Sequence, residues 1–163
     1  MSNMLPSRPR LPQFQRMSFG IVASQYNPEY VKGLVDATRA ELSVLVPNVS
    51  VTLFEVPGAF EIPVILQELA HRGGFDAIIA LGVIIQGETA HAELIGNSVT
   101  QALQNIALRF RTPVVHEVLL VKDEEQARAR TLCAELNRGT EAARAAVRIA
   151  QVLGEVKQRY PEA

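Results

Sequence analysis

Residues 87–91 combine side chains and backbone suited to binding an anion and moving a proton. Gly87, Glu88 and Thr89 follow a long apolar run, and His91 comes two residues after the Thr89 hydroxyl. Glycine lets the backbone approach a ligand closely, and the N–H groups that begin a helix attract anions. The threonine hydroxyl could bind a phosphate oxygen or, in the simpler interpretation, cap the helix that follows. The segment is therefore either a phosphate-binding loop or an ordinary helix start.

His91 is the residue of this segment suited to proton transfer. A neutral imidazole can pass a proton in either direction near physiological pH, and His91 directly follows the anion-attracting loop. The alternative is a surface or packed histidine with no chemical role. His71 lies beside Arg72 at a predicted helix end, where we expect it only to complement the helix dipole.

Several other kinds of site lack their sequence signatures. The chain has neither a G-x-x-x-x-G-K-[ST] loop for nucleotide phosphates nor a G-x-G-x-x-G dinucleotide motif. No cysteines, histidines and acidic residues have the spacing of metal ligands, so we expect no metal site. No serine or cysteine stands in a nucleophile elbow, and we expect Cys133 to lie in a helix and belong to the core. What remains is chemistry that needs positioning, a phosphate-binding group and a proton carrier.

The composition is that of an ordinary globular protein. Of 163 residues, 48% are hydrophobic and 20% charged, and the formal net charge of −1 argues against a nucleic-acid or anionic-membrane surface. The apolar run at residues 77–85 is too short to cross a bilayer. Cys133 is the only cysteine, which favours a reducing compartment, the cytoplasm. Residues 1–16 contain three prolines and no acidic residue; we expect a flexible arm, with docking on a neighbouring subunit as the alternative.

Strand-like and helix-like segments alternate four times along the chain. Asn27 followed by Pro28 predicts a helix start with a side-chain cap, and Pro47 closes this helix. Alternation predicts one domain, residues 17–160, with a doubly wound parallel sheet. Strands are predicted at residues 17–25, 49–56, 75–85 and 112–121, and helices within residues 28–46, 57–74, 90–110, 123–136 and 137–160.

The polar segments lie where the predicted strands end. "SQYN", "PGAFE" and "IQGETAH" each follow or close a strand, and "HEV" lies in the last one. In doubly wound sheets, ligands bind at the carboxyl ends of the strands, where loops meet helix starts. We therefore expect the functional site at this end of the sheet.

Taken in order, the motifs resemble those of one enzyme family. They are "VPGAFEIP" (56–63), "ALGVIIQGETAH" (80–91), "PVV" (113–115), "EEQARAR" (124–130) and "NRGTEAA" (137–143). Their order and spacing resemble those of the 6,7-dimethyl-8-ribityllumazine synthases over residues 17–153. The resemblance implies an α/β fold, a flavodoxin-like three-layer α/β/α sandwich with a central four-stranded parallel sheet.

The resemblance also implies an activity. Members of the family condense 5-amino-6-(D-ribitylamino)uracil with 3,4-dihydroxy-2-butanone 4-phosphate in the penultimate step of riboflavin biosynthesis, and release phosphate and water. They need no metal and no cofactor. They assemble as pentamers, decamers or sixty-subunit shells, with sites between neighbouring subunits, and an association with riboflavin synthase is expected.

Carried over by position, the resemblance assigns roles to individual residues. His91 corresponds to the proton-transfer residue, and Tyr26 to an aromatic that stacks on the pyrimidine. His116 stands where an aromatic, commonly Phe, packs near the substrate across the subunit interface. The remaining pyrimidine and ribityl positions are Ala59, Phe60, Glu61, Val83, Ile84 and Ile85, and the butanone phosphate positions are Glu88, Thr89 and Arg130.

The chain departs from the family pattern near its last helix. The family's "GTKAGNKG" reads "LCAELNRG" here, so that Ala134 replaces one lysine and Arg138 the other. The loss of one positive charge and two glycines leaves the size of the assembly open. Two alternatives remain: a non-catalytic flavin- or lumazine-binding or shell-forming relative of the same fold, and an unrelated flavodoxin-like signalling or nucleotide domain.

Overall fold

Four apolar segments form the strands of one parallel sheet in the computed structural model, which describes residues 5–10, 16–87 and 90–161. The strands are β1 (Arg16–Ser24), β2 (Asn48–Val56), β3 (Ala77–Ile85) and β4 (Val114–Val121). Their order in the sheet is β2-β1-β3-β4, and every pairing is parallel. β3 is apolar throughout and largely buried, as a central strand covered on both faces must be.

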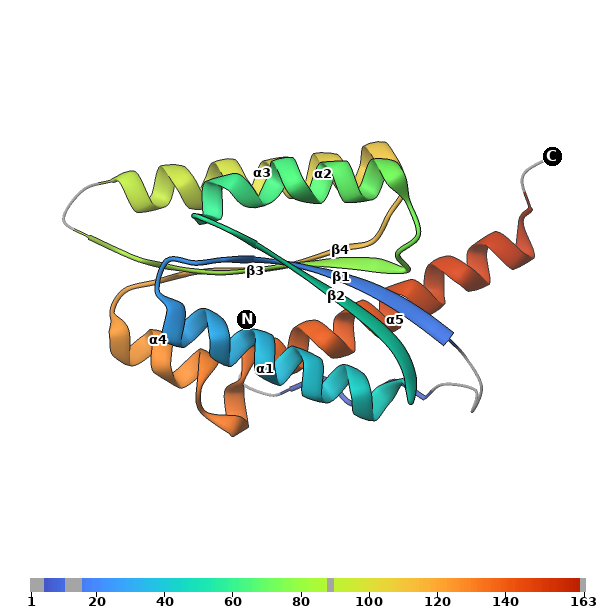
Figure 1. Ribbon diagram of the computed structural model, residues 1–163, viewed down its shortest axis with the longest axis horizontal. Coiled ribbons are helices and arrows are strands. Elements are labelled where there is room, and N and C mark those ends of the chain that lie inside the picture. Colours follow the sequence, from blue (N-terminus) through green and yellow to red (C-terminus); the bar gives the residue numbers. More distant parts are fainter. Residues whose placement is uncertain (1–4, 11–15, 88–89, 162–163) are drawn as a thin grey trace.

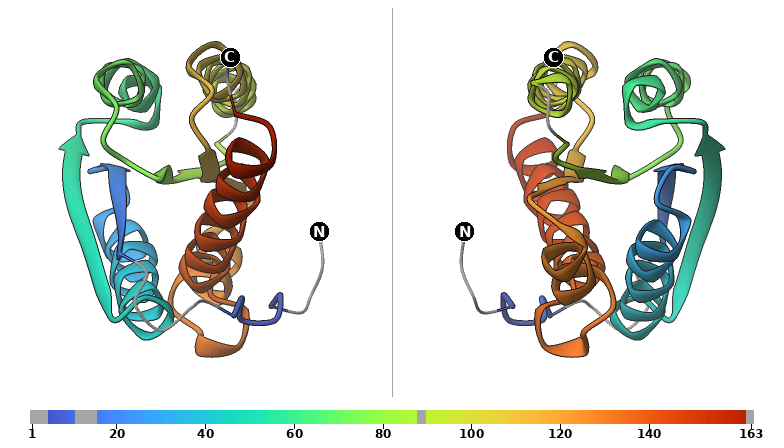
Figure 2. Two further views of the ribbon diagram at one scale, coloured as in Figure 1. Left: turned by 90° about the vertical axis from the view of Figure 1, so that its right-hand side faces the viewer. Right: turned by 90° about the vertical axis from the view of Figure 1, so that its left-hand side faces the viewer.

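Helices cover both faces of this sheet. α2 (Ile62–Arg72) and α3 (His91–Phe110) lie on one face, and α1 (Pro28–Leu45), α4 (Glu124–Thr131) and α5 (Arg138–Arg159) lie on the other (Figures 1 and 2). Each face has its own apolar core, one of them packed between the sheet and α1 and α5, the other between the sheet and α2 and α3. The predicted three-layer α/β/α sandwich with a four-stranded parallel sheet is thus confirmed.

α1 and α5 approach each other closely. One side of α1 is buried along the whole helix, and it includes Val31, Leu34, Val35, Thr38, Leu42 and Leu45. The Thr38 hydroxyl lies 2.7 Å from the Leu34 carbonyl oxygen and 3.0 Å from that of Gly139 in α5. A Cβ added at Gly139 would lie 2.2 Å from the Leu34 oxygen. Only glycine permits this contact, which fixes the start of α5 against α1.

The role predicted for Asn27 is wrong. Pro28 is the first residue of α1, as predicted, but the Asn27 side chain does not cap the helix. Asn27 adopts a left-handed backbone conformation with φ of 56°, which asparagine tolerates better than most residues. Its Nδ2 donates to the carbonyl oxygen of Val83 at 2.8 Å. The side chain therefore ties the loop after β1 to the carboxyl end of β3.

The helix predicted over residues 123–136 is also shorter than expected. α4 ends at Thr131, and Cys133 is exposed just before a 3-10 turn, Ala134–Leu136. The reason lies in Asn137, whose Nδ2 donates to the Thr131 carbonyl oxygen at 2.6 Å while its Oδ1 accepts from Gly139 N at 2.8 Å. One buried side chain thus holds the end of α4 and caps α5, so the prediction of a helical, buried Cys133 is wrong.

Part of the N-terminal segment contacts its own chain. Arg8 donates to both carboxylate oxygens of the buried Glu41 on α1, at 2.8 and 2.9 Å, and Arg144 on α5 donates to the Glu41 Oε1 and to the Pro6 carbonyl oxygen. Gln151 donates to the Arg10 carbonyl oxygen. Since residues 1–4 and 11–15 lie outside the described residues, the flexible arm over residues 1–16 stays a prediction.

Candidate active site

The strands end at a cavity of about 730 Å³, here called the strand-end cavity. It lies at the carboxyl ends of β1 and β3, on the face of the sheet that carries α2 and α3. These strand ends are on the left in Figure 1. The turn after β2 and the first turn of α3 complete its walls. Most of the predicted site residues line it, namely Tyr26, Ala59, Phe60, Glu61, Val83, Ile84, Ile85 and His91.

Tyr26 presents an aromatic ring at this cavity. Its side chain is 70% exposed, while its backbone N–H donates to the Pro57 carbonyl oxygen at 3.3 Å, and the Gln25 N–H donates to that of Val56 at 2.8 Å. The Asn27–Val83 hydrogen bond holds the same loop from the other side. An exposed ring on a fixed backbone is an available stacking surface for a flat ligand.

Glu61 stands next to this ring. Its Oε2 accepts from the Gly58 N–H at 2.9 Å, and Oε1 accepts no hydrogen bond from the described residues, so it can accept from ligand hydroxyls. A Cβ added at Gly58 would lie 2.9 Å from Glu61 Oε2 and 3.1 Å from the Tyr26 ring. The absence of a side chain at residue 58 therefore lets the ring and the carboxylate sit beside each other.

His91 is the first residue of α3, one residue after the predicted helix start, and its exposed side chain borders the strand-end cavity. Two contacts position this helix start. Gln86 N donates to the Val121 carbonyl oxygen at 2.8 Å, and its Nε2 donates to Glu93 Oε1 at 3.2 Å. The other two residues of the predicted phosphate loop, Glu88 and Thr89, lie outside the described residues.

His116 does not line the strand-end cavity. It lies on β4 and faces α3, where its Nε2 is 2.8 Å from Thr100 Oγ1, and its Nδ1 accepts from the Val118 N–H at 3.3 Å. Because Nδ1 accepts, Nε2 carries the proton and donates to Thr100, which in turn donates to the Gly96 carbonyl oxygen. Burial lowers the pKa of the His116 imidazole, in keeping with this neutral tautomer.

Arg130 also lies away from the cavity. It belongs to α4, on the opposite face of the sheet, and its Nη1 donates to the Gln126 carbonyl oxygen at 3.4 Å (Figure 1). Among the described residues, those that line the strand-end cavity include no lysine or arginine. Around this cavity, the described part of the chain therefore brings together an aromatic ring, a carboxylate and an imidazole, but no cation to bind a phosphate.

Among the described residues, five that line the cavity were not predicted as site residues. Asn27 holds the loop after β1 against β3 through its hydrogen bond to the Val83 carbonyl oxygen. Pro57 and Gly58 form the turn that anchors this loop from the other side. Ile95 stands one turn after His91 in α3, a spacing that places both side chains on the same face of the helix. Ser24 is the last residue of β1 and the first of the segment "SQYN". The strand-end rule, that ligands bind at the carboxyl ends of the strands in doubly wound sheets, could therefore have pointed to it.

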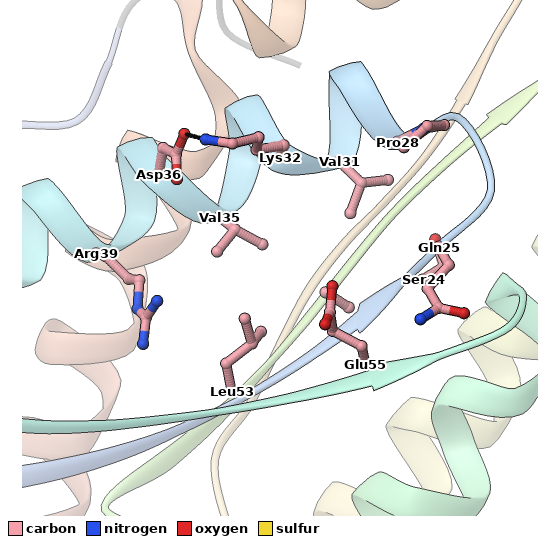
Figure 3. Close-up of a pocket in the computed structure, with 11 residues that line it drawn as sticks. Ser24, Gln25, Pro28, Val31, Lys32, Val35, Asp36, Arg39, Leu53 and Glu55 are labelled. Carbon is pink, nitrogen blue, oxygen red and sulfur yellow. Dashed lines mark hydrogen bonds and ion pairs between the residues drawn. The ribbon is translucent and has the colours of Figure 1, made fainter.

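A second cavity of about 350 Å³ lies between α1 and β2 on the other face of the sheet. Figure 3 shows Val31 and Val35 of α1 opposite Leu53 of β2, with Arg39 and Glu55 at the sides. None of the predicted site residues lines this cavity.

Within residues 5–10, 16–87 and 90–161, no group of three or more His, Cys, Asp or Glu side chains is placed to hold a metal ion. None of the helices in those ranges combines the length and the apolar character that crossing a membrane requires.

Known proteins resemble this chain over most of its length. The model of a family described as 6,7-dimethyl-8-ribityllumazine synthase matches residues 16–154. A relative of that name from Burkholderia multivorans is 44% identical over 137 residues, 83% of this chain and 77% of the relative. One from Paraburkholderia phymatum is 44% identical over 143 residues, 87% and 81% of the two chains. The match excludes a chance likeness of motifs in an unrelated signalling or nucleotide domain, and the chain belongs to the 6,7-dimethyl-8-ribityllumazine synthase family.

Proposed function

We propose that this protein condenses 5-amino-6-(D-ribitylamino)uracil with 3,4-dihydroxy-2-butanone 4-phosphate to form 6,7-dimethyl-8-ribityllumazine, with release of phosphate and water. The observation that carries the proposal is the strand-end cavity, which holds Tyr26, Glu61 and His91 together in a chain of the synthase family. The single cysteine supports a reducing compartment, the cytoplasm, as the place of the reaction. A non-catalytic relative is not favoured, because both relatives are named as synthases.

The residues of the cavity suit the pyrimidine substrate. The exposed ring of Tyr26 stacks on the flat heterocycle, and the open side of the Glu61 carboxylate accepts hydrogen bonds from the ribityl hydroxyls. Ala59 and Phe60 hold the ribityl chain from the neighbouring turn, and the strand end at Val83, Ile84 and Ile85 lines the ring pocket.

His91 carries protons during the reaction. Imine formation between the amine and the ketone releases water, and departure of the phosphate requires a proton to be removed from the neighbouring carbon. An imidazole at the cavity wall can serve both steps. Holding the two reactants together supplies much of the acceleration, because it converts a bimolecular step into a unimolecular one.

We further propose that a second copy of the chain completes the site. The butanone carries a phosphate, yet the described residues around the cavity supply no cation. Glu88 and Thr89 supply the loop, and Arg130 of the second copy supplies the bidentate contact to the phosphate. His116 of that copy adds its ring beside the pyrimidine. The assembly is a pentamer or a multiple of one.

The activity is tested with the purified protein and both substrates, by following the fluorescent lumazine and the released phosphate. We expect His91→Ala to lower turnover about a hundredfold, the usual contribution of a general acid–base residue. His71→Ala, at the far end of α2, is the matched control and retains full turnover. Phosphate release no faster than without protein would refute the activity, and an unchanged rate in His91→Ala would remove this residue from the mechanism.

The shared site is tested by mixing two impaired variants. His91→Ala and Arg130→Ala are co-expressed with different tags and purified as mixed assemblies. In random mixtures, roughly a quarter of the sites pair an intact His91 on one copy with an intact Arg130 on the next, so activity returns to that level. Native mass measurement gives the number of subunits. Mixed assemblies as inactive as the two parents would show that each chain supplies its own arginine.

A further inference from the structure

Ser24 has a buried hydroxyl without a hydrogen-bond partner. It is the last residue of β1, only 3% exposed, and its Oγ is buried with no partner in the described chain. Buried hydroxyl groups are almost always paired, because an unpaired one loses its hydrogen bonds to water without replacement. Since Ser24 also lines the strand-end cavity, its missing partner points to a molecule that enters the cavity.

The hydroxyl lies on the side of the sheet that carries this cavity. A Cβ added at Gly82 would lie 3.1 Å from Ser24 Oγ and 3.5 Å from Ile62 Cδ1. Ile62 and Val22 belong to the core beneath α2 and α3, and Ser24 follows Val22 by the two residues that keep a side chain on the same face. Ser24 also borders the α1–β2 cavity (Figure 3), but its Oγ points to the opposite layer.

The other polar side chains of the cavity are engaged or lie at its mouth. Asn27 Nδ2 donates to Val83, and Glu61 accepts from the Gly58 N–H. Tyr26 and His91 are exposed. Among the described residues, the other side chains that line the cavity are apolar, so a carbonyl or N–H group of a ligand buried beside them finds Ser24 Oγ as a hydrogen-bond partner.

We propose that Ser24 contacts the substrate: its Oγ hydrogen-bonds to the amide-type edge of the pyrimidinedione ring. The inference rests on the proposed function, because that function supplies the ring. A hydroxyl both donates and accepts, so it can pair with either the carbonyl or the N–H group of this edge. Oγ lies beside Gly82; to reach the ring edge, the side chain would rotate about χ1 to another staggered position, toward the cavity that Ser24 lines.

Ser24→Ala in the full-length protein tests the proposal with two measurements. The dissociation constant for 5-amino-6-(D-ribitylamino)uracil, measured by calorimetry, increases about tenfold, as expected for one lost hydrogen bond. The unfolding temperature of the ligand-free variant does not fall, because the variant removes an unpaired hydroxyl. Ser24→Cys, which keeps a weak donor of similar size, gives an intermediate dissociation constant. Ser43→Ala on α1, where the hydroxyl bonds only to the Arg39 carbonyl oxygen, changes neither the ligand affinity nor the cavity.

A ribityl-free ligand locates the contact on the ring. With 5,6-diaminouracil, the ratio of dissociation constants between Ser24→Ala and wild type stays near tenfold. A ratio near one with this ligand would place the contact on the ribityl chain and overturn the assignment to the ring edge.

Two results would overturn the role of Ser24 itself. One is unchanged affinity of Ser24→Ala for the ribityl substrate. The other is an unfolding temperature lowered by more than about 3 °C, since that would reveal a partner within the protein. The wild-type assay separates the two proposals: a wild type that forms no lumazine refutes the function, whereas an active wild type with an unaffected Ser24→Ala refutes only the role of Ser24.

Discussion

Glu117 on β4 makes the stability of the fold depend on pH. It alternates with Val115 and Leu119, which pack in the core beneath α1 and α5, so its carboxyl group faces the same layer. The pKa of this carboxyl is raised from 4.5 to about 7: burial is the largest cause, the negative charge of Glu141 adds to it, and Arg138 opposes the change. Arg138 also forms an ion pair with Glu141. Glu117→Gln removes the titratable carboxyl group and keeps a side chain of nearly the same shape.

The sign of the pH effect on the free energy of unfolding follows from the protonation of Glu117 in the unfolded and folded chain. In the unfolded chain Glu117 loses its proton near pH 4.5, and in the folded chain only near pH 7. Between these values the folded state holds more protons, so the free energy of unfolding decreases as pH rises through this window. At 1.36 kcal/mol per pKa unit the shift corresponds to about 3 kcal/mol at most. Because part of the side chain reaches solvent, we expect ~1–2 kcal/mol.

Urea unfolding at pH 5, 6, 7 and 8, at one protein concentration, measures this effect. Glu117→Gln should match the wild type at pH 5 and exceed its unfolding free energy by ~1–2 kcal/mol at pH 8. Glu135→Gln, at an exposed position in the turn before α5, is the control and should follow the wild type at every pH. A variant whose advantage does not grow between pH 5 and pH 8 would refute the account of a buried, proton-holding carboxyl.

Two glycine substitutions test close contacts. In Gly58→Ala the new Cβ would displace Glu61 and the Tyr26 ring, so the KM for the pyrimidine should rise roughly tenfold with little loss of stability. Steady-state rates at saturating ketone phosphate measure this KM, and an unchanged value would contradict the contact. In Gly139→Ala the Cβ would collide with the backbone oxygen of Leu34, so we expect a loss of about 3 kcal/mol or more in urea unfolding, and a wild-type midpoint would disprove the contact.

The fold could be predicted from the spacing of apolar residues and from the alternation of strand and helix segments along the chain. Some local details could not, because they depend on residues far away in the sequence. An Asn-Pro pair predicts a helix start with a side-chain cap, and the pattern is the same when the asparagine side chain bonds to another part of the chain. In this chain Asn27 pairs with the Val83 carbonyl oxygen, which is 56 residues away. Similarly, the helical pattern continues past Thr131, and α4 ends there because Asn137 binds the Thr131 carbonyl oxygen. Neither hydrogen bond can be predicted from the residues next to it in the sequence.

The strand-end rule explains which predicted residues came together. Those that line the cavity follow β1 and β2, or lie at the end of β3 and just after it, and the carboxyl ends of these strands are neighbours in one sheet. His116 and Arg130 do not, because His116 lies within the edge strand β4 and Arg130 on a helix of the opposite face. The missing partner of the Ser24 hydroxyl is a property of three-dimensional packing, so a serine at a strand end gives no sign of it.

The separation of the cavity from Arg130 bears on how copies of the chain would assemble. If the arginine of one copy serves the cavity of the next, the contact joins two unlike surfaces, head to tail. Such contacts either propagate into an open filament, which leaves one terminal site without its arginine, or close into a ring, which completes every site. A ring has one kind of interface and as many sites as chains. The proposed pentamer satisfies this condition, and so does any closed multiple built from it, because assembly of rings into larger shells leaves the interface that completes the site unchanged.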